Sequence, residues 1–275
     1  MSLFDKYFSE KRLSLMKNNI FARHMKSSAL VIFLFLSFCS NSQAFDFSTW
    51  DILIKKHVVP KTVDGILINS VDYISLKENP LFYRLNTKLK SYSLDNFGTE
   101  KSKMAFWINV YNILAAKMIT NNYPIESIKD AGSLFKSVWN QLAGNIGGEM
   151  YTLNDIEHKI LRKMNDPRIH VAIVCASVSC PDLRLEVYAE DKLYEQLDDQ
   201  MKSFLGSREK GMKFDEQKNR IYISSIFKWF KEDFESYGGV IKYIGRYITE
   251  EKNKILKDPK MKIAYLDYNW KINGY

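Results

Sequence analysis

The longest hydrophobic stretch of the chain is residues 104–119, which read MAFWINVYNILAAKMI. Hydrophobic residues would occupy every side of a helix formed by this stretch, and such a helix is buried all round. The pattern therefore predicts the central helix of a globular domain, with Ser102 as its N-cap and an end at Asn122 and Pro124. The stretch is shorter than the roughly 17–25 residues that a membrane span needs.

Two polar residues interrupt this helix, Asn109 and Asn112. They are three positions apart and so share one face of the helix. A buried amide without a partner costs roughly 1–3 kcal/mol, so both should be hydrogen-bonded to something fixed. The sequence leaves two interpretations open, because such amides can fasten a neighbouring loop or orient a catalytic side chain.

A second helix is predicted over residues 153–164, where hydrophobic residues recur with the spacing of one buried stripe. Glu157 falls inside this stripe, and His158 lies beside it. Carboxylates are almost never fully buried without a partner. Glu157 is therefore either paired with Arg162 or a lysine in a structural ion pair, or part of an active site.

The clearest predicted strand is residues 169–176, IHVAIVCA, which is short and hydrophobic on both faces. It carries His170 on one face and Cys175 on the other. A loop leads from it to Cys180 and Pro181. Because proline suits the first position of a helix, we expect Cys180 at the N-cap of a following helix.

The rest of the chain alternates further helices with short strands, which indicates an α+β fold. We expect helices packed around a small, mostly antiparallel sheet, with one long buried central helix. One predicted helix begins after residue 48 and another after residue 224. Further helices are predicted at 66–76, 81–89, 188–205 and 240–248. Residues 60–65 are predicted to form a turn. Residues 149–153 are predicted as the return strand of one hairpin, and residues 214–223 as a second hairpin. A late strand is predicted at 262–268.

The chain has 275 residues and a formal net charge of +8, which is mildly basic. No basic stripe is interleaved with aromatic residues, so we expect no nucleic-acid partner. Six Lys or Arg residues stand against two acidic ones in residues 1–44. The basic start, the hydrophobic run 29–39 and the small residues Ser42 and Ala44 predict a signal peptide at 1–44.

This signal peptide would leave a single domain at 45–275, with a helical N-terminal part at 45–95 and a core at 96–275. The protein would then be periplasmic or secreted, with no membrane span after cleavage. An uncleaved N-terminal anchor is the alternative, although residues 29–39 are short for a span.

The mature chain would keep only Cys175 and Cys180. Disulfides persist in exported proteins, so these two thiols are either a bridge or a reactive site. The sequence leaves both possibilities open, and the functional interpretation depends on which one holds.

Several motifs in this order and spacing resemble the DUF547 family over roughly residues 80–275. The resemblance implies a fold and a set of recurring residues, but no reaction. Those residues are the two asparagines, the adjacent Glu157 and His158, His170, and the two cysteines. The matching motifs are AFWINVYN at 105–112, LNDIEHKILR at 153–162, DPRIHVAIVCASVSCPDL at 166–183, the helix with KWF at 228–230, and YLDYNWKIN at 265–273.

These residues predict a cysteine-dependent hydrolase or acyl transferase acting on an amide or thioester. A thiol at a helix N-terminus has its thiolate stabilised by the helix dipole, which favours Cys180 as the nucleophile. His158 or His170 would be the base, and Glu157, Asn109 or Asn112 would orient it. We place Cys175, Ser179, Arg162 and Trp229 in the binding site of a small molecule or peptide.

The alternative is a non-catalytic envelope module for binding or assembly, in which Cys175 and Cys180 form a disulfide. The asparagine, glutamate and histidine side chains would then form a polar network in the core. We expect neither a cofactor nor a metal, because the histidines and cysteines lack the spacing of a metal site.

Overall fold

The structure is a computed structural model, and it describes residues 44–133 and 136–275. The predicted signal peptide lies outside the described residues, apart from Ala44. Residues Ala44–Tyr275 form one compact unit. In the described part of the chain, no helix is both long enough and hydrophobic enough to cross a membrane. The domain boundaries given above stay predictions.

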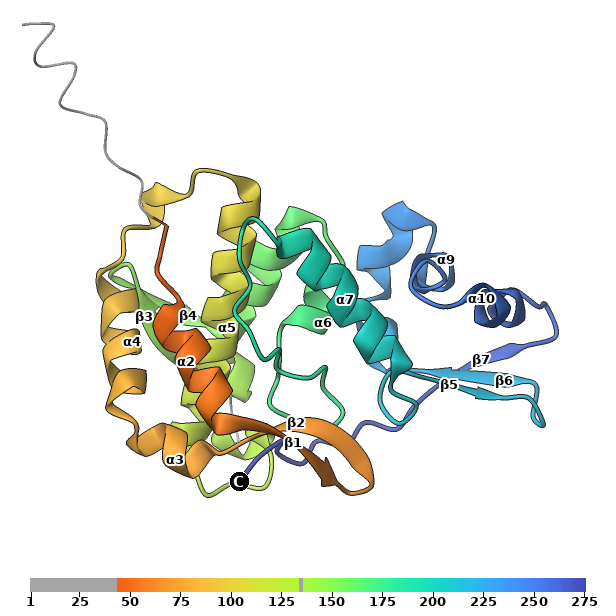
Figure 1. Cartoon of the computed structure of the whole chain (residues 1–275), viewed down its shortest axis with the longest axis horizontal. Coiled ribbons are helices and arrows are strands. Elements are labelled where there is room, and N and C mark those ends of the chain that lie inside the picture. Colours follow the sequence, from red (N-terminus) through yellow and green to blue (C-terminus); the bar gives the residue numbers. More distant parts are fainter. Residues whose placement is uncertain (1–43, 134–135) are drawn as a thin grey trace, which may run out of the picture. The chain divides into compact units, whose positions relative to one another are not determined.

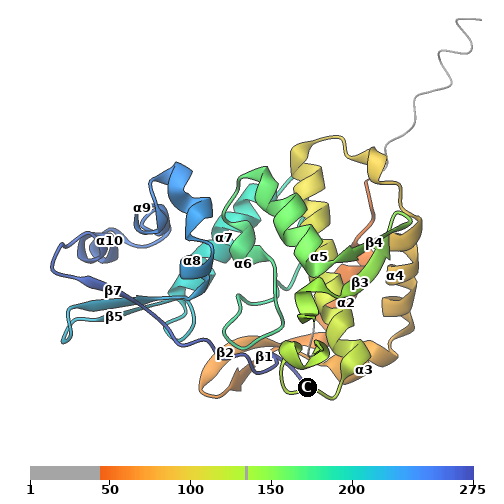
Figure 2. The same ribbon diagram turned by 180° about the vertical axis from the view of Figure 1, so that it is seen from behind.

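The long buried helix is α5 (Glu100–Asn122), which Figures 1 and 2 show in yellow to green. Residues 104–116 are buried without interruption, as the sequence predicts. The N-cap is Thr99 rather than Ser102, because the Thr99 side chain accepts a hydrogen bond from the Ser102 backbone N–H at 3.0 Å. The α+β class and the long central helix are confirmed, and the predicted cap is three residues too late.

Helices from the N-terminal part of the chain pack around α5. The first cluster of buried hydrophobic residues joins all of them to the central helix, with Leu53, Tyr73 and Leu85 among its members. Figure 1 shows these helices on one side of α5. They are α2 (Ser48–His57), α3 (Tyr73–Glu78) and α4 (Pro80–Ser91).

A hairpin of β1 (Val58–Val63) and β2 (Ile66–Val71) replaces the turn predicted at 60–65 and most of the helix predicted at 66–76. Asp64 and Gly65 both have positive φ, 51° and 79°. This conformation matches the Asp-Gly hairpin turn, which continues the twist of the two strands. The prediction was wrong because the Asp-Gly signal between two β-branched segments was overlooked.

Residues 169–176 do not form a strand. Ile169–Ala172 is the short helix α6, and an irregular segment runs on through Cys175. All four α6 residues are buried. A segment that is hydrophobic on every side has no periodicity that could separate a strand from a helix. The predicted central strand was therefore wrong, and the sheet lies elsewhere.

The helix predicted at 153–164 forms in two parts of unusual winding. Residues Asp155–Ile160 form the π-helix η5, and Leu161–Met164 form the 3₁₀-helix η6. A widened helical turn of this type occurs often at functional sites. It places Glu157 among the buried residues.

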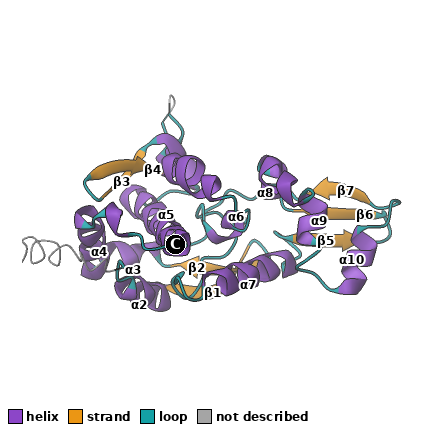
Figure 3. Cartoon of the chain, turned by 90° about the horizontal axis from the view of Figure 1, so that it is seen from above, coloured by secondary structure: helices purple, strands orange, loops and turns teal. Residues whose placement is uncertain are grey.

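A second hydrophobic cluster gathers the C-terminal elements, including Phe204, Phe227 and Phe234. The three-stranded sheet has the order β5–β6–β7, with β5–β6 antiparallel and β6–β7 parallel (Figure 3). The predicted hairpin and late strand are both present. The elements are α7 (Leu193–Gly206), β5 (Met212–Asp215), β6 (Arg220–Ile223), α8 (Ile226–Trp229), η7 (Lys231–Tyr237), α9 (Val240–Ile244), α10 (Glu250–Leu256) and β7 (Lys262–Tyr265).

The C-terminal segment after β7 runs back to the N-terminal hairpin, where the C-terminus lies (Figure 2). It forms isolated bridges at Ser177–Ile272 and Val71–Gly274. Residues distant in sequence thereby hold the loop that carries the two cysteines. The remaining elements are η2 (Leu94–Asn96), η3 (Ile128–Ala131), η4 (Val138–Asn140) and the hairpin β3 (Leu142–Ile146) with β4 (Glu149–Thr152).

Candidate active site

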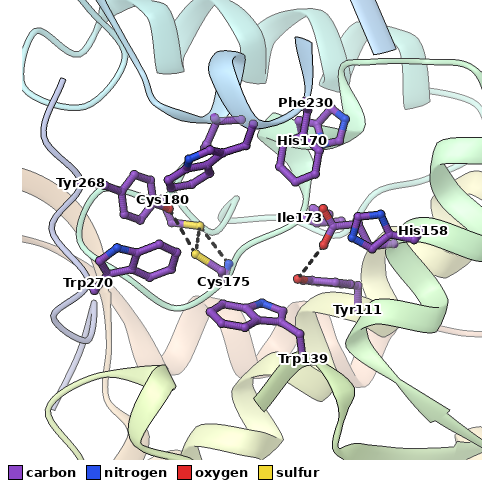
Figure 4. A pocket seen from close by; sticks show the side chains of 13 residues that line it. Tyr111, Trp139, His158, His170, Ile173, Cys175, Cys180, Phe230, Tyr268 and Trp270 are labelled. Atoms are coloured by element: carbon purple, nitrogen blue, oxygen red, sulfur yellow. Dashed lines mark hydrogen bonds between the residues drawn. The ribbon is translucent and has the colours of Figure 1, made fainter. Parts of the chain in front are cut away.

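A pocket of about 350 Å³ lies where α5, η5, α6, the cysteine loop, α8 and the C-terminal segment meet (Figure 4). Six of its thirteen lining residues are Trp, Tyr or Phe, and its polar groups are of the types used in catalysis. Such a pocket is a candidate binding or active site. Its lining residues are Tyr111, Trp139, Glu157, His158, His170, Ile173, Cys175, Cys180, Ile226, Trp229, Phe230, Tyr268 and Trp270.

The pocket gathers six of the ten site residues predicted from the sequence. Their functional roles stay predictions, but their convergence from separate segments is the geometry that such roles require. The six are Cys175, Cys180, His158, His170, Glu157 and Trp229, and the four outside the lining are Asn109, Asn112, Ser179 and Arg162.

Asn109 and Asn112 fasten backbone rather than a catalytic side chain. Asn109 donates to the Tyr188 carbonyl at 2.8 Å and accepts from the Tyr188 N–H at 3.0 Å. Asn112 donates to the Ala172 carbonyl at 3.0 Å and accepts from the Val174 N–H at 2.8 Å. Asn112 thereby fixes the segment that leads directly to Cys175.

In the structure the two cysteines are free thiols in contact with each other, and the disulfide of the alternative interpretation is not formed. Their sulfur atoms are 2.8 Å apart, and the Cys175 N–H donates to the Cys180 sulfur at 2.9 Å. The Cys175 sulfur also lies 3.0 Å from Ser177 Oγ and 3.3 Å from the Tyr268 hydroxyl. Cys175 is half-buried, whereas Cys180 is only 4% exposed.

Burial raises the pKa of the Cys175 thiol, but the hydrogen bonds from Cys180, Ser177 and Tyr268 outweigh it and lower that pKa to about 7. Burial raises the pKa of Cys180, and the neighbouring Cys175 raises it further. When one of the two thiols loses its proton, the negative charge therefore lies on Cys175. A thiolate is the nucleophilic form of cysteine, so the geometry favours Cys175 over Cys180.

The expected helix after Cys180 is absent. Residues 181–190 are irregular, and the next helix, α7, begins at Leu193. No helix dipole acts on the Cys180 sulfur from this segment. The proline at 181 was therefore misread as a helix start, and hydrogen bonds to Cys175 take the place of the expected dipole.

The hydrogen bonds of the two histidines fix their tautomers. Arg162 can only donate, so His158 Nδ1, at 2.7 Å from the guanidinium, accepts and the His158 proton sits on Nε2. His170 Nε2 lies 2.7 Å from Asp233 Oδ2 and donates to it. His170 Nδ1 is buried and has no partner among the described residues. His170 Nδ1 is therefore a buried nitrogen with a free acceptor lone pair, and His158 presents its Nε2–H as a hydrogen-bond donor.

Burial lowers the pKa of both imidazoles, and the positive charge of Arg162 lowers the pKa of His158 further. Both rings are therefore neutral at pH 7. No hydrogen bond joins either ring to a cysteine sulfur within the described residues, so any proton transfer between them needs a bound substrate or water as intermediary.

Asp233, on η7, is a site-supporting residue that the sequence analysis missed. It accepts from Arg162 Nε and Nη2 at 2.6 and 2.7 Å and from His170 Nε2. Although burial acts against the charged form, His170 and Arg162 hold its pKa well below the usual range. Arg162 therefore pairs with Asp233 rather than with Glu157. One acidic residue in an exposed, charged segment gave no sequence signal for this role.

Glu157 is only 7% exposed, and its carboxyl accepts a hydrogen bond from the Tyr111 hydroxyl at 3.4 Å. Burial raises its pKa to about 7, and the nearby charge of Cys175 contributes in the same direction. The ion pair with Arg162, one of the two interpretations that the sequence left open for Glu157, is not formed. Glu157 is therefore a carboxyl group that can hold or release a proton near neutral pH.

Replacing Glu157 by glutamine is expected to change how stability depends on pH. Between pH 4.5 and about 7 the folded protein keeps this proton, whereas the unfolded chain has released it. Stability therefore falls as pH rises through this window, by on the order of 3 kcal/mol. Urea unfolding should show Glu157→Gln more stable than wild type by about that amount at pH 8 and similar to it at pH 4.

The exposed Glu149 on β4 provides the matched control, since it lies on the neighbouring hairpin. Glu149→Gln should follow the wild type at both pH values. Equal stability of wild type and Glu157→Gln at pH 8 would contradict a raised pKa for the buried Glu157 carboxyl.

Of the aromatic residues that line the pocket, only Trp229 was predicted from the sequence. Trp270 contacts Trp139, Trp229 and Tyr268, with ring centroids 5.8, 5.6 and 4.4 Å apart. His170 stacks on Phe230 at 4.0 Å. The available signal was the aromatic density of the C-terminal segment and of the KWF motif.

Ser179 and Arg162 support the site from outside the pocket. Ser179 Oγ accepts from the Asn269 N–H at 2.8 Å, which ties the cysteine loop to the C-terminal segment. Among the residues that the structure describes, no three His, Cys, Asp or Glu side chains are grouped so that they could hold a metal ion.

Comparison with known proteins identifies one family. Residues 94–205 match the family described as "Protein of unknown function, DUF547". No curated protein and no solved structure matches the chain. The match covers α5, η5, α6 and both cysteines, whereas Trp229, Asp233, Tyr268 and Trp270 lie beyond it. Residues 94–205 of this chain therefore form a DUF547 domain, as the motifs around the asparagines and cysteines indicated.

Proposed function

We propose that this protein is a cysteine-dependent hydrolase or acyl transferase whose nucleophile is Cys175. The observation that carries the proposal is the environment of its sulfur. Three hydrogen-bond partners stabilise a thiolate there, on the wall of a pocket that also holds a titratable carboxyl group and two oriented imidazoles. The sequence alone favoured Cys180 as the nucleophile, whereas the hydrogen bonds around the two sulfur atoms favour Cys175.

In the proposed reaction, the Cys175 thiolate attacks the carbonyl carbon of an ester, thioester or amide, and a C–S bond forms. The bond from that carbon to the leaving group then breaks. Glu157, protonated near neutral pH, supplies a proton to the leaving group. Water or an acceptor nucleophile next attacks the acyl-cysteine, and this second step restores the thiolate.

The imidazoles fit supporting roles in this reaction. The Nε2–H of His158 is the hydrogen-bond donor left for the negative charge that develops on the carbonyl oxygen. The Glu157 carboxylate left by the first step takes the proton of water in the second step, which restores both Glu157 and the thiolate. His170, held by Asp233 and stacked on Phe230, supports the wall of the pocket. The aromatic walls favour an acyl group that is hydrophobic or aromatic.

Trapping of an acyl-enzyme tests the proposal. The full chain is incubated with p-nitrophenyl butyrate and with a butyryl thioester, quenched with acid, and mapped by peptide mass spectrometry. The expected result is an acyl group on Cys175 in the wild type and in Cys39→Ser, which serves as the matched control. Glu157→Gln should slow thioester turnover roughly 10²–10⁴-fold, the range of general acid catalysis.

Acylation of Cys180 in place of Cys175, or no adduct with either ester, would contradict the proposal. The competing interpretation, a non-catalytic binding module, predicts no adduct on a folded protein. Thermal unfolding of every variant, followed by circular dichroism, separates loss of chemistry from loss of fold.

A further inference from the structure

The two sulfur atoms lie 2.8 Å apart but in different surroundings. Cys175 is half-buried on the pocket wall, whereas Cys180 lies behind it at 4% exposure. A disulfide needs an S–S distance of about 2.0 Å, so a small movement of one side chain would join them. A ligand in the pocket can therefore reach the Cys175 thiol, whereas the Cys180 thiol is buried behind it.

The backbone between the cysteines is held in the shape that brings them together. Ala176 adopts a left-handed conformation with φ 58°, and the Cys180 N–H donates to the Ser177 carbonyl at 3.0 Å. The C-terminal segment secures this turn, because the Val178 N–H donates to the Lys271 carbonyl at 2.8 Å. A non-glycine residue in this region is uncommon and indicates an enforced conformation.

The hydrogen bonds around the two cysteines also allow the negative charge to pass from Cys175 to Cys180. The Cys175 N–H donates to the Cys180 sulfur at 2.9 Å, and this bond remains available when Cys175 is bonded to something else. It would then stabilise negative charge on Cys180. Once Cys175 loses its own charge, the repulsion that raises the pKa of Cys180 is also removed.

We propose that Cys175 and Cys180 form a reversible dithiol–disulfide couple that exchanges with organic disulfides, with Cys175 attacking and Cys180 resolving. This activity needs only the two sulfurs and an open pocket. It does not depend on the acyl-transfer chemistry proposed above, and formation of the internal disulfide would switch that chemistry off.

The exchange balances in two steps. The Cys175 thiolate attacks one sulfur of R–S–S–R, an S–S bond forms to Cys175, and the first RS⁻ leaves with the proton of Cys180. The Cys180 thiolate then attacks the Cys175 sulfur, and the second R–S group leaves as a thiolate. The substrate gains two electrons, and the protein is left with the Cys175–Cys180 disulfide. A dithiol compound reverses both steps.

Oxidised glutathione is the probe for this proposal. The reduced full chain, carrying Cys39→Ser so that only the pair remains, is mixed with it at pH 7, quenched with acid and mapped by mass spectrometry. The expected result is a protein lighter by two hydrogen atoms, with a disulfide between Cys175 and Cys180 and two glutathione molecules released. Dithiothreitol should restore the dithiol.

Single-cysteine variants assign the two roles. In Cys180→Ser the reaction should stop at a stable glutathione adduct on Cys175, because no second thiol can resolve it. In Cys175→Ser the adduct on Cys180 should form at least about 30-fold more slowly at pH 6, the ratio of thiolate expected for thiols of pKa about 7 and 8.5.

Three results would overturn the proposal: no internal disulfide in the Cys39→Ser protein, equal rates for the two single-cysteine variants, or a stable adduct when both cysteines are present. The Cys39→Ser measurement needs no change at the site, so it decides the matter even if a variant fails to fold. An acyl adduct without exchange would contradict this inference alone, and exchange without an acyl adduct would contradict only the proposed function.

Discussion

Replacing Cys175 by serine is expected to abolish the rapid alkylation of this protein by iodoacetamide near neutral pH. The Cys175 thiol has its pKa lowered to about 7, whereas burial and the neighbouring charge raise that of Cys180. At pH 6 a thiol of pKa about 7 is ionised roughly 30-fold more than an ordinary cysteine, with a pKa of about 8.5. The labelling rate should rise about tenfold per pH unit below pH 7 and level off above it.

The measurement is the rate of carbamidomethylation of each cysteine, located by fragmentation of the labelled peptides, between pH 5 and 9 on the reduced full chain. Cys39→Ser is the control, and it should leave the fast phase unchanged. Tyr268→Phe removes the hydroxyl that makes one of the three hydrogen bonds to the Cys175 sulfur. The pKa of Cys175 should then rise, and the midpoint of the labelling profile should move to higher pH. A fast phase that maps to Cys180, or survives in Cys175→Ser, would be evidence against Cys175 as the nucleophile.

Replacing Asn112 by alanine is expected to destabilise the folded protein by about 4 kcal/mol, because two buried backbone groups each lose a partner worth roughly 1–3 kcal/mol. These groups are the Ala172 carbonyl and the Val174 N–H. Asn112 is only 4% exposed, so water cannot replace the amide without opening the core. Urea unfolding followed by fluorescence gives the free energy directly.

The same variant should also slow the alkylation of Cys175, since Val174 immediately precedes it. Asn122→Ala is the matched control on the same helix. Asn122 is exposed at the end of α5, and among the described residues its side chain bonds only to the Met118 carbonyl of its own helix. Its replacement should cost less than about 0.5 kcal/mol. Equal stability losses for the two variants would mean that Asn112 does not hold the segment before Cys175.

The elements that were predicted correctly have patterns with a single local solution. The 104–116 part of α5 is hydrophobic on all sides and too long for a strand, which leaves a buried helix, and the hairpin of β5 and β6 alternates around a turn. Residues 169–176 are equally hydrophobic, but they are too short for length to decide between helix and strand. Their conformation depends on Asn112, which binds the backbone at Ala172 and Val174 from α5.

The residues of the candidate site also fall into those that the sequence reveals and those that only the structure reveals. Glu157, His158, His170 and the cysteines stand out in the sequence because they are polar or reactive residues within hydrophobic segments, and the pocket brings them together. Asp233 and Tyr268 do not stand out, since nothing near them in the chain reveals what they contact. Both act on groups more than sixty residues away, Asp233 on His170 and Tyr268 on Cys175.

The amino-acid sequence by itself determined the α+β class, the buried central helix, the DUF547 domain and the set of reactive side chains. Hydrophobic pattern and residue chemistry are local properties, so they can be read along the chain. Only the tertiary structure decided that Cys175 carries the charge of the thiol pair, because hydrogen bonds from three other residues offset the cost of burial. That balance depends on distances between segments that only the folded chain brings together.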